Sequence, residues 1–226
     1  MSDAARPDRT YRDGVRAVAP LAIAVVGFGI SYGVLARAAG MGVLAPIVMS
    51  MTTFAGSAQF ATVSVLGDGG TIAAAVGAAV LLNARYLAIG FSAAGALAGN
   101  KLRRMLESQL VVDETWALAN RGGGEFDRGV LLGAGMMLFG AWVGGTVIGV
   151  VAGDALGDPE TLGLDAAFPA VFLVLLIAQL RSRDAAAAAL AGAAIALALV
   201  PFTPPGVPII AAVAGCLIGL RGEQRE

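Results

Sequence analysis

The stretch MSMTTFAGSAQF, residues 49–60, limits what this chain can fold into more than any other. It lies inside an uncharged run, 38–67, that is long and apolar enough to enter a lipid bilayer. Its centre, 55–59, is small and polar, yet backbone groups at membrane depth must be paired within protein or face a wet cavity. The segment therefore either breaks there and lines a cavity, or continues as a helix whose small residues permit close contact with another helix.

The composition indicates a membrane protein. Mean hydropathy is +0.80, and 58% of the residues are apolar. Only 14% are charged, against about 25% in soluble domains. At roughly 20 residues per membrane segment, the chain predicts a single domain, 1–226: an all-α polytopic helix bundle of about six to eight segments. The net charge of −1 gives no indication of a nucleic acid partner.

The absence of histidine excludes several kinds of site. The chain has no His, so a Ser–His catalytic pair, a His-based zinc site and a His proton relay are excluded. The single Cys216 excludes an internal disulfide and a Cys-based metal site, so we expect no metal and no cofactor. An intramembrane protease with Ser57 as nucleophile would need Lys101, the only lysine, which stands beside two arginines outside the apolar runs. We therefore expect no enzyme.

Basic residues predict the topology. Cytoplasmic segments are enriched in Lys and Arg, and four segments fit this role: 1–16, 101–104, 181–183 and 221–225. The chain must cross the membrane an even number of times between consecutive cytoplasmic segments. In the second half, runs 129–153 and 166–180 form one pair. Runs 185–200 and 206–220 form another, divided by the proline-rich break at 201–208.

The first half contains an odd number of apolar runs, namely 17–36, 38–67 and 71–100. Run 17–36 is longer than the 7–15 apolar residues usual in a signal peptide, so it is predicted to be the first membrane helix, after a cytoplasmic tail, 1–16. One of these runs must therefore enter and leave on the same side, or the amphipathic stretch 101–128 must cross the membrane. The simplest topology makes 38–67 a re-entrant hairpin with its bend near Gly56. Glycine pairs at GxxxG spacing predict close packing within the bundle or against a partner: Gly29/Gly33, Gly129/Gly133, Gly140/Gly144 and Gly145/Gly149/Gly153.

Charged residues inside or beside apolar runs are candidate functional groups. Arg85 interrupts 71–100 and has Asn83 nearby; it is either functional or a side chain that snorkels or caps a helix end. Segment 101–128 reads as an amphipathic connector on the cytoplasmic side, with one helix over 101–120. Within it, Asp113 and Glu114 either lie on a solvated face or enter the substrate path, where burial would favour proton exchange.

Three motifs together resemble the AzlC family, the large subunits of bacterial branched-chain amino acid exporters: FAGSAQF at 54–60, Asn-Ala-Arg at 83–85 and DETWAL at 113–118. The resemblance covers nearly the whole chain. It implies a multi-pass protein of the bacterial inner membrane that exports leucine, isoleucine, valine and sometimes methionine. It also implies a small AzlD-type membrane subunit and energy from the proton gradient. Relatives often have His after the Asn-x-Arg motif where this chain has Tyr86, so coupling here would use Asp113, Glu114 or another acid.

The motifs and the resemblance predict one site. A helix that starts in the broken segment presents free amides to a substrate carboxylate, Arg85 adds positive charge, and small residues leave room for a branched side chain. The alternatives are a non-catalytic membrane subunit and a transporter of another small apolar solute. The predicted binding residues are Phe54, Ala55, Gly56, Ser57, Gln59, Asn83 and Arg85, with Asp113 and Glu114 as proton-coupling candidates.

Overall fold

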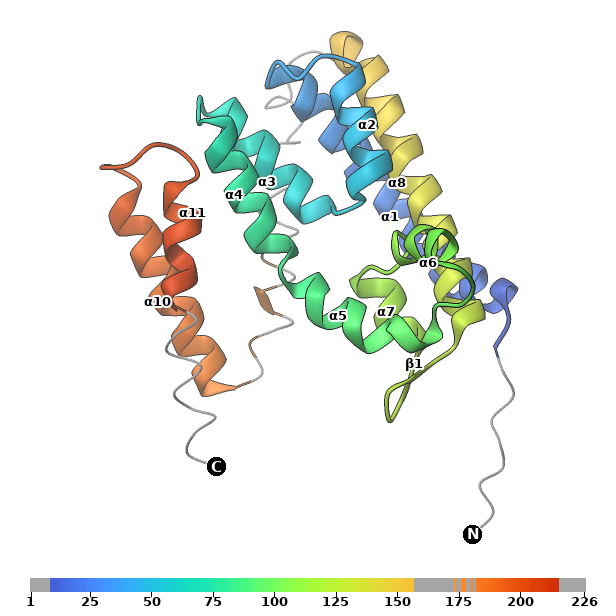
Figure 1. The fold of residues 1–226 in the computed structure, drawn as a ribbon. Helices are drawn as coiled ribbons and strands as arrows, with labels where there is room; N and C mark the ends of the chain where they lie inside the picture. Colours follow the sequence, from blue (N-terminus) through green and yellow to red (C-terminus); the bar gives the residue numbers. More distant parts are fainter. Residues whose placement is uncertain (1–8, 157–172, 174–175, 178–179, 181, 216–226) are drawn as a thin grey trace.

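The computed structural model describes residues 9–156, 173, 176, 177, 180 and 182–215. Nearly all of these residues are helical (Figure 1). Most of the predicted span 166–180 lies outside the described residues, as do residues 216–220 of the last run, the first half of 1–16 and all of 221–225. The described part of the chain is nearly all-α, as predicted, apart from one short β-hairpin.

Two long helices form the scaffold of the fold. α1 (Tyr11–Ala38) and α8 (Arg128–Leu156) lie against each other along most of their length (Figure 1). A Cβ on Gly29 would lie 2.7 Å from the carbonyl oxygen of Trp142, and one on Gly33 would lie 2.5 Å from that of Thr146. Only glycine permits such an approach, so the packing role predicted for the Gly29/Gly33 pair is confirmed.

The glycines of α8 divide into two groups. A Cβ on Gly145 or Gly149 would overlap the carbonyl oxygen of Val26 or Ile30 in α1. Gly140 and Gly144 have no described atom within 4 Å of an added Cβ. The packing prediction is thus confirmed for the first group, while the second group makes no contact of this kind with the described chain.

This division gives a stability prediction. Gly149→Ala is expected to lower the free energy of unfolding by about 1–3 kcal/mol, because the new methyl group forces α1 and α8 apart. Gly144→Ala is the matched control on the same helix, and it should be neutral or slightly stabilising because alanine is the better helix former. Thermal unfolding of both variants in the same detergent measures the difference. Equal midpoints would contradict the α1–α8 packing.

Segment 49–60 is broken, as predicted. α2 (Leu44–Thr53) ends before Phe54, and α3 (Gly56–Gly67) starts two residues later. Phe54 adopts a left-handed conformation (φ 39°, ψ 54°), which reverses the chain. A Cβ on Gly67 would lie 3.6 Å from the Cβ of Ala39, so both ends of the segment lie at the end of the bundle where α1 finishes (Figure 1). The segment is therefore a helical hairpin.

A second break stands at Arg85. α4 (Ile72–Asn83) and α5 (Arg85–Ala93) are bent by 40° at Ala84, and a short 3₁₀ turn, η1 (Ala94–Ala96), extends α5. Among the described residues, α1 and α8 are each long and apolar enough to span a membrane, and the bent pair adds a third span if it is counted as one. The predicted six to eight segments exceed this number.

The prediction of a single helix over 101–120 is wrong. α6 (Lys101–Ser108) and α7 (Asp113–Ala119) are separate helices, followed by the antiparallel hairpin of β1 (Asn120–Gly122) and β2 (Glu125–Phe126). Val112 is extended, and its N–H donates to Thr115 Oγ1 at 2.9 Å, which starts a new helix. The buried, β-branched Val111 and Val112 favour this extended link.

Two buried carboxylates hold the ends of these helices together. Asp127 is paired with Arg9 (2.6 Å) and Arg121, and Glu107 is paired with Arg103 (2.8 Å) and Arg128. Burial by itself would raise the pKa of both carboxyls, but the hydrogen bonds from the arginines outweigh it, so both pKa values are lowered. Both acids therefore stay charged at neutral pH and fasten α6 and the start of α1 to the start of α8.

The proline-rich break is also present. α10 (Arg183–Leu199) is followed by a loop, and α11 (Val207–Ala212) and the 3₁₀ turn η2 (Val213–Gly215) come after it. The loop turns at Gly206, whose φ is +92°, and Pro208 lies in the first turn of α11. This hairpin lies beside α4 (Figure 1), where Ile210 Cδ1 would be 3.0 Å from a Cβ on Gly77.

Candidate functional site

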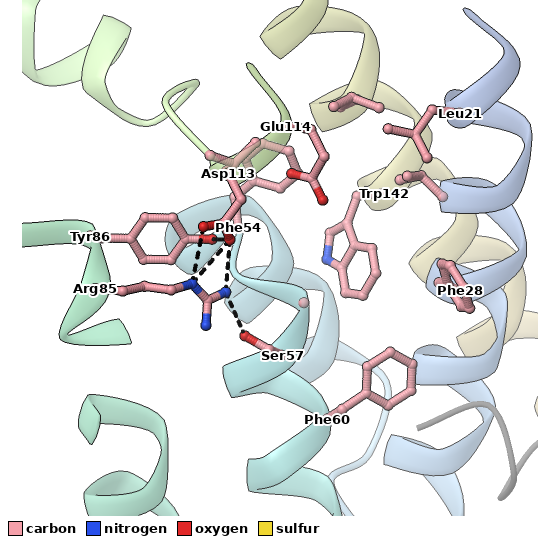
Figure 2. A pocket seen from close by; sticks show the side chains of 14 residues that line it. Leu21, Phe28, Phe54, Ser57, Phe60, Arg85, Tyr86, Asp113, Glu114 and Trp142 are labelled. Carbon is pink, nitrogen blue, oxygen red and sulfur yellow. Dashed lines mark hydrogen bonds and ion pairs between the residues drawn. The ribbon is translucent and has the colours of Figure 1, made fainter. Parts of the chain in front are cut away.

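A pocket of about 140 Å³ lies at the break between α2 and α3. Its walls come from α1, the α2–α3 break, α5, α7 and α8, so motifs far apart in the sequence meet there (Figure 2). Most of the lining is apolar, with a small polar group on one side. The lining residues are Leu21, Val25, Phe28, Phe54, Gly56, Ser57, Phe60, Arg85, Tyr86, Val112, Asp113, Glu114, Leu138 and Trp142.

Aromatic rings form the apolar side. The Trp142 ring is stacked on Tyr32, with ring centroids 5.8 Å apart, and it meets Phe60 edge-on at 6.1 Å. Gly56 allows this ring to lie against the start of α3, since an added Cβ would be only 3.1 Å from Trp142 Cη2. The rings are held by their neighbours, so the wall is preformed.

Arg85 organises the polar side. Its Nε donates to Asp113 Oδ2 at 3.0 Å, and its Nη2 lies 2.9 Å from the same oxygen and 3.0 Å from Ser57 Oγ (Figure 2). Its Nη1 donates to the carbonyl of Leu82 at 3.0 Å. The guanidinium thus joins the three motifs that the sequence singled out. Of its five N–H groups, one on Nη1 has no acceptor among the described residues.

Tyr86 completes this cluster. Its hydroxyl is 3.4 Å from Asp113 Oδ2, and the Arg85 guanidinium carbon lies 5.0 Å from the centre of its ring. Tyr86 therefore supports the Arg85–Asp113 ion pair as a neutral donor and as an aromatic surface.

Glu114 lines the same pocket without sharing in the cluster. Its carboxylate points toward the cavity between Asp113 and Trp142 (Figure 2). It makes no ion pair or hydrogen bond with another described side chain. The two neighbouring acids thus differ: Asp113 is the counter-ion of Arg85, whereas Glu114 lines the pocket without such a contact.

Gln59 lies outside the pocket, in a fully buried hydrogen-bond network. Its Oε1 accepts from Trp142 Nε1 at 3.0 Å and from the backbone N–H of Ala55 at 3.3 Å. Its Nε2 donates to Ser50 Oγ at 2.9 Å, and Ser50 lies 2.9 Å from Thr146 Oγ1. The side chain predicted to hydrogen-bond the substrate thus binds α2, α3 and α8 together at the break.

Two further predicted residues do not line the pocket. Ala55 is buried and contributes its backbone N–H to Gln59. Asn83 ends α4 just before the bend, and its buried Oδ1 has no hydrogen-bond partner among the described residues. The predicted residues that the structure brings to the pocket are Phe54, Gly56, Ser57, Arg85, Asp113 and Glu114.

The sequence reasoning missed the apolar side of the pocket. Trp142 is one of two tryptophans, and it lies among the glycines of α8, a position that could have marked it. Phe28 and Leu138 carry no such signal, because an apolar residue in an apolar run is equally suited to face lipid. Phe60 stands in the FAGSAQF motif but was not among the predicted binding residues. Among the described residues, no three His, Cys, Asp or Glu side chains are grouped closely enough to hold a metal ion.

Comparison with known proteins places the chain in a family. The model of the AzlC protein family matches residues 20–156. An uncharacterized membrane protein of Archaeoglobus fulgidus is 34% identical over 218 residues, which cover 94% of this chain and 96% of that protein. The inner membrane protein YgaZ of Escherichia coli is 26% identical over 226 residues, covering 93% and 90%.

A further relative carries a functional name. The branched-chain amino acid transport protein AzlC of Bacillus subtilis is 27% identical over 221 residues, covering 93% of this chain and 85% of that protein. No solved structure matches the chain. The relatives are named as membrane or transport proteins, and α1 and α8 have the length and apolarity of membrane spans. This helical membrane protein therefore belongs to the AzlC family.

Proposed function

We propose that this protein exports branched-chain amino acids across the bacterial inner membrane and that the pocket at the α2–α3 break binds them. One observation carries the proposal: a guanidinium and a helix N-terminus lie at one side of a small cavity that is otherwise lined by apolar and aromatic side chains. That combination suits a carboxylate attached to an apolar side chain. The name of the Bacillus subtilis relative supports this substrate class.

The carboxylate would bind between Arg85 and the start of α3. Within α3, the first hydrogen bond of the helical pattern is Gln59 N–H to Ala55 O, so the amides of Gly56, Ser57 and Ala58 precede it. These amides and the helix dipole favour an anion. Arg85 adds its remaining Nη1 N–H and a guanidinium whose charge Asp113 partly balances, and the Ser57 hydroxyl lies 3.0 Å from Arg85 Nη2.

The substrate side chain would lie among Phe28, Phe60 and Trp142. An apolar cavity of about 150 Å³ holds a ligand the size of benzene, and this pocket is about 140 Å³. A valine, leucine or isoleucine side chain is of this size, whereas a large polar side chain would lose its hydration without finding partners. The cavity therefore favours small branched apolar amino acids.

Glu114 is the proposed proton carrier. Asp113 is held by Arg85 and Tyr86, so its charge is required where it is. Glu114 has no such partner and lines the same pocket, so its protonation can change the charge that the substrate meets. The N-terminus is proposed to be cytoplasmic, and a small AzlD-type subunit is the proposed partner, as for the family that the motifs resemble.

Flux measurements in proteoliposomes test the proposal. Protein reconstituted with its small subunit should give saturable valine flux that an opposing proton gradient accelerates, with leucine, isoleucine and methionine as competitors. Glu114→Gln should abolish the acceleration. Glu125→Gln, an exposed acid in the β-hairpin, is the control and should leave it unchanged. Absence of flux for every amino acid, with and without the subunit, would refute the exporter and favour a non-catalytic role.

A further inference from the structure

A second cavity lies next to the pocket, on the side of α6. Its volume is about 280 Å³, and its polar lining includes Ser108, the last residue of α6, and Gln109, the first residue of the link to α7. Ser108 is exposed, so this cavity reaches the protein surface. The full lining is Thr53, Phe54, Tyr86, Gly90, Leu97, Ser108, Gln109, Val111 and Val112.

The two cavities share three residues. Phe54, Tyr86 and Val112 line both of them, so a single layer of side chains separates the substrate pocket from the outer cavity. These residues come from three elements: the α2–α3 break, α5 and the link before α7. A partition made from three elements opens when any one of them moves relative to the others.

Phe54 is the member of this partition with an unusual backbone. It is the only non-glycine residue with positive φ in the described part of the chain. Left-handed backbone is strained for a residue with a Cβ, and such strain persists only where the surrounding structure imposes it, often at moving parts. Its ring is held by an edge-to-face contact with Phe139 of α8, with centroids 5.3 Å apart.

The neighbouring contacts tie the partition to the link between α6 and α7. Gln109 Nε2 donates to the carbonyl of Thr52 at 2.8 Å, directly before the α2–α3 break. A shift of the link between α6 and α7 therefore pulls on the backbone that carries Phe54. On the other side of the break, Gln59 and Trp142 hold the start of α3 in place.

We propose that the outer cavity is the access vestibule of the substrate pocket and that Phe54 is the gate between them. An apolar amino acid would enter past Ser108 and Gln109, wait in the vestibule, and pass when the Phe54 ring leaves Tyr86 and Val112. The identity of the substrate that passes the gate depends on the proposed function. The connection between the two cavities depends only on the three residues that line both of them.

Cysteine accessibility tests the gate. In a Cys216→Ser background, Ser57→Cys places a thiol in the inner pocket, and a separate Ser108→Cys protein identifies the α6 side of the membrane. A membrane-impermeant cationic thiosulfonate is then applied from each side of sealed vesicles. Phe54→Gly removes the ring and is unstrained at positive φ. It should raise the labelling rate at position 57 by roughly tenfold or more from the α6 side only, as expected when a minor open state becomes dominant.

Controls make the result decisive. Phe202→Ala removes an exposed ring in the loop between α10 and α11 and should leave labelling unchanged. Val112→Ala shortens a side chain that separates the two cavities and comes from a different element, so it should also accelerate labelling. This second variant tests the gate even if the Phe54→Gly protein does not fold. Unchanged labelling in both wall variants, or an equal rise from both sides of the membrane, overturns the gate.

The same assay separates the gate from the proposed function. Protection of the thiol at position 57 by valine reports whether the pocket binds an amino acid. Acceleration by Phe54→Gly reports whether the two cavities connect. If Phe54→Gly accelerates labelling but valine does not protect the thiol, the gate is supported and the substrate is refuted. If valine protects the thiol but Phe54→Gly does not accelerate labelling, the substrate is supported and the gate is refuted.

Discussion

Arg85→Gln is expected to reduce valine transport by about tenfold to a hundredfold, because a hydrogen bond to a charged group contributes about 1.5–3 kcal/mol. The loss has two causes in the structure. The substrate carboxylate loses its cation, and Asp113 loses the partner that lies 2.9 Å away. Initial efflux rates from loaded cells, at matched protein levels in the membrane, measure the effect.

A double variant separates these two causes. Arg85→Gln with Asp113→Asn removes both charges, so thermal stability should recover toward that of the parent protein. Transport should remain low, with a raised KM, because carboxylate recognition is still missing. Arg16→Gln, at an exposed position on α1, is the matched control for loss of an arginine. Transport at the parent rate by the double variant would show that Arg85 serves only to balance Asp113.

Gln59→Met is expected to lower the free energy of unfolding by about 3 kcal/mol, since each buried polar group left without a partner costs about 1–3 kcal/mol. The indole N–H of Trp142 and the backbone N–H of Ala55 would both lose their acceptor, Gln59 Oε1. Methionine has nearly the same length, so little of the loss comes from a cavity. The midpoint of thermal unfolding should fall by roughly 10 °C.

Thr62→Val is the control for this second variant. Thr62 lies on the same helix, and its hydroxyl donates only to the carbonyl of Ala58 within that helix, so little should change. In the folded fraction of the Gln59→Met protein, the KM for valine should stay near the parent value, because Gln59 does not line the pocket. A raised KM with normal stability would instead restore Gln59 as a substrate ligand.

Chain breaks were largely predictable from local sequence. The small and polar centre of 49–60 predicted a break near Gly56, and the structure is broken at Phe54 and Ala55, directly before α3 begins at Gly56. The prolines at 201–208 are poor at continuing a helix, and the chain leaves the helical conformation there between α10 and α11. The parity of the basic segments added a constraint that is independent of these residues. The prediction of one helix over 101–120 was wrong because apolar spacing does not report that Val112 is extended or that Val111 and Val112 are buried.

Polarity at membrane depth marked most of the polar side of the pocket. Arg85 and Ser57 were predicted because polar groups in apolar runs require partners. Asp113 and Glu114 were candidates as adjacent acids beside apolar residues in the connector 101–128, and all four residues line the pocket. The same reasoning placed Gln59 in the site, although its partners are Ser50 and Trp142. A buried polar residue needs hydrogen bonds, but the amino-acid sequence does not say whether the protein or the substrate provides them.

The sequence by itself predicted a helical membrane protein that is broken within 49–60, with one arginine and two adjacent acids as candidate functional groups. These properties follow from residue chemistry and from the cost of unpaired groups in hydrocarbon. Only the tertiary structure decided that Asp113, and not Glu114, pairs with Arg85. It also decided that Trp142, which is 83 residues from Gln59, donates a hydrogen bond to Gln59 and lines the pocket. Such choices depend on which helices meet, and helix packing is set by shape over the whole chain.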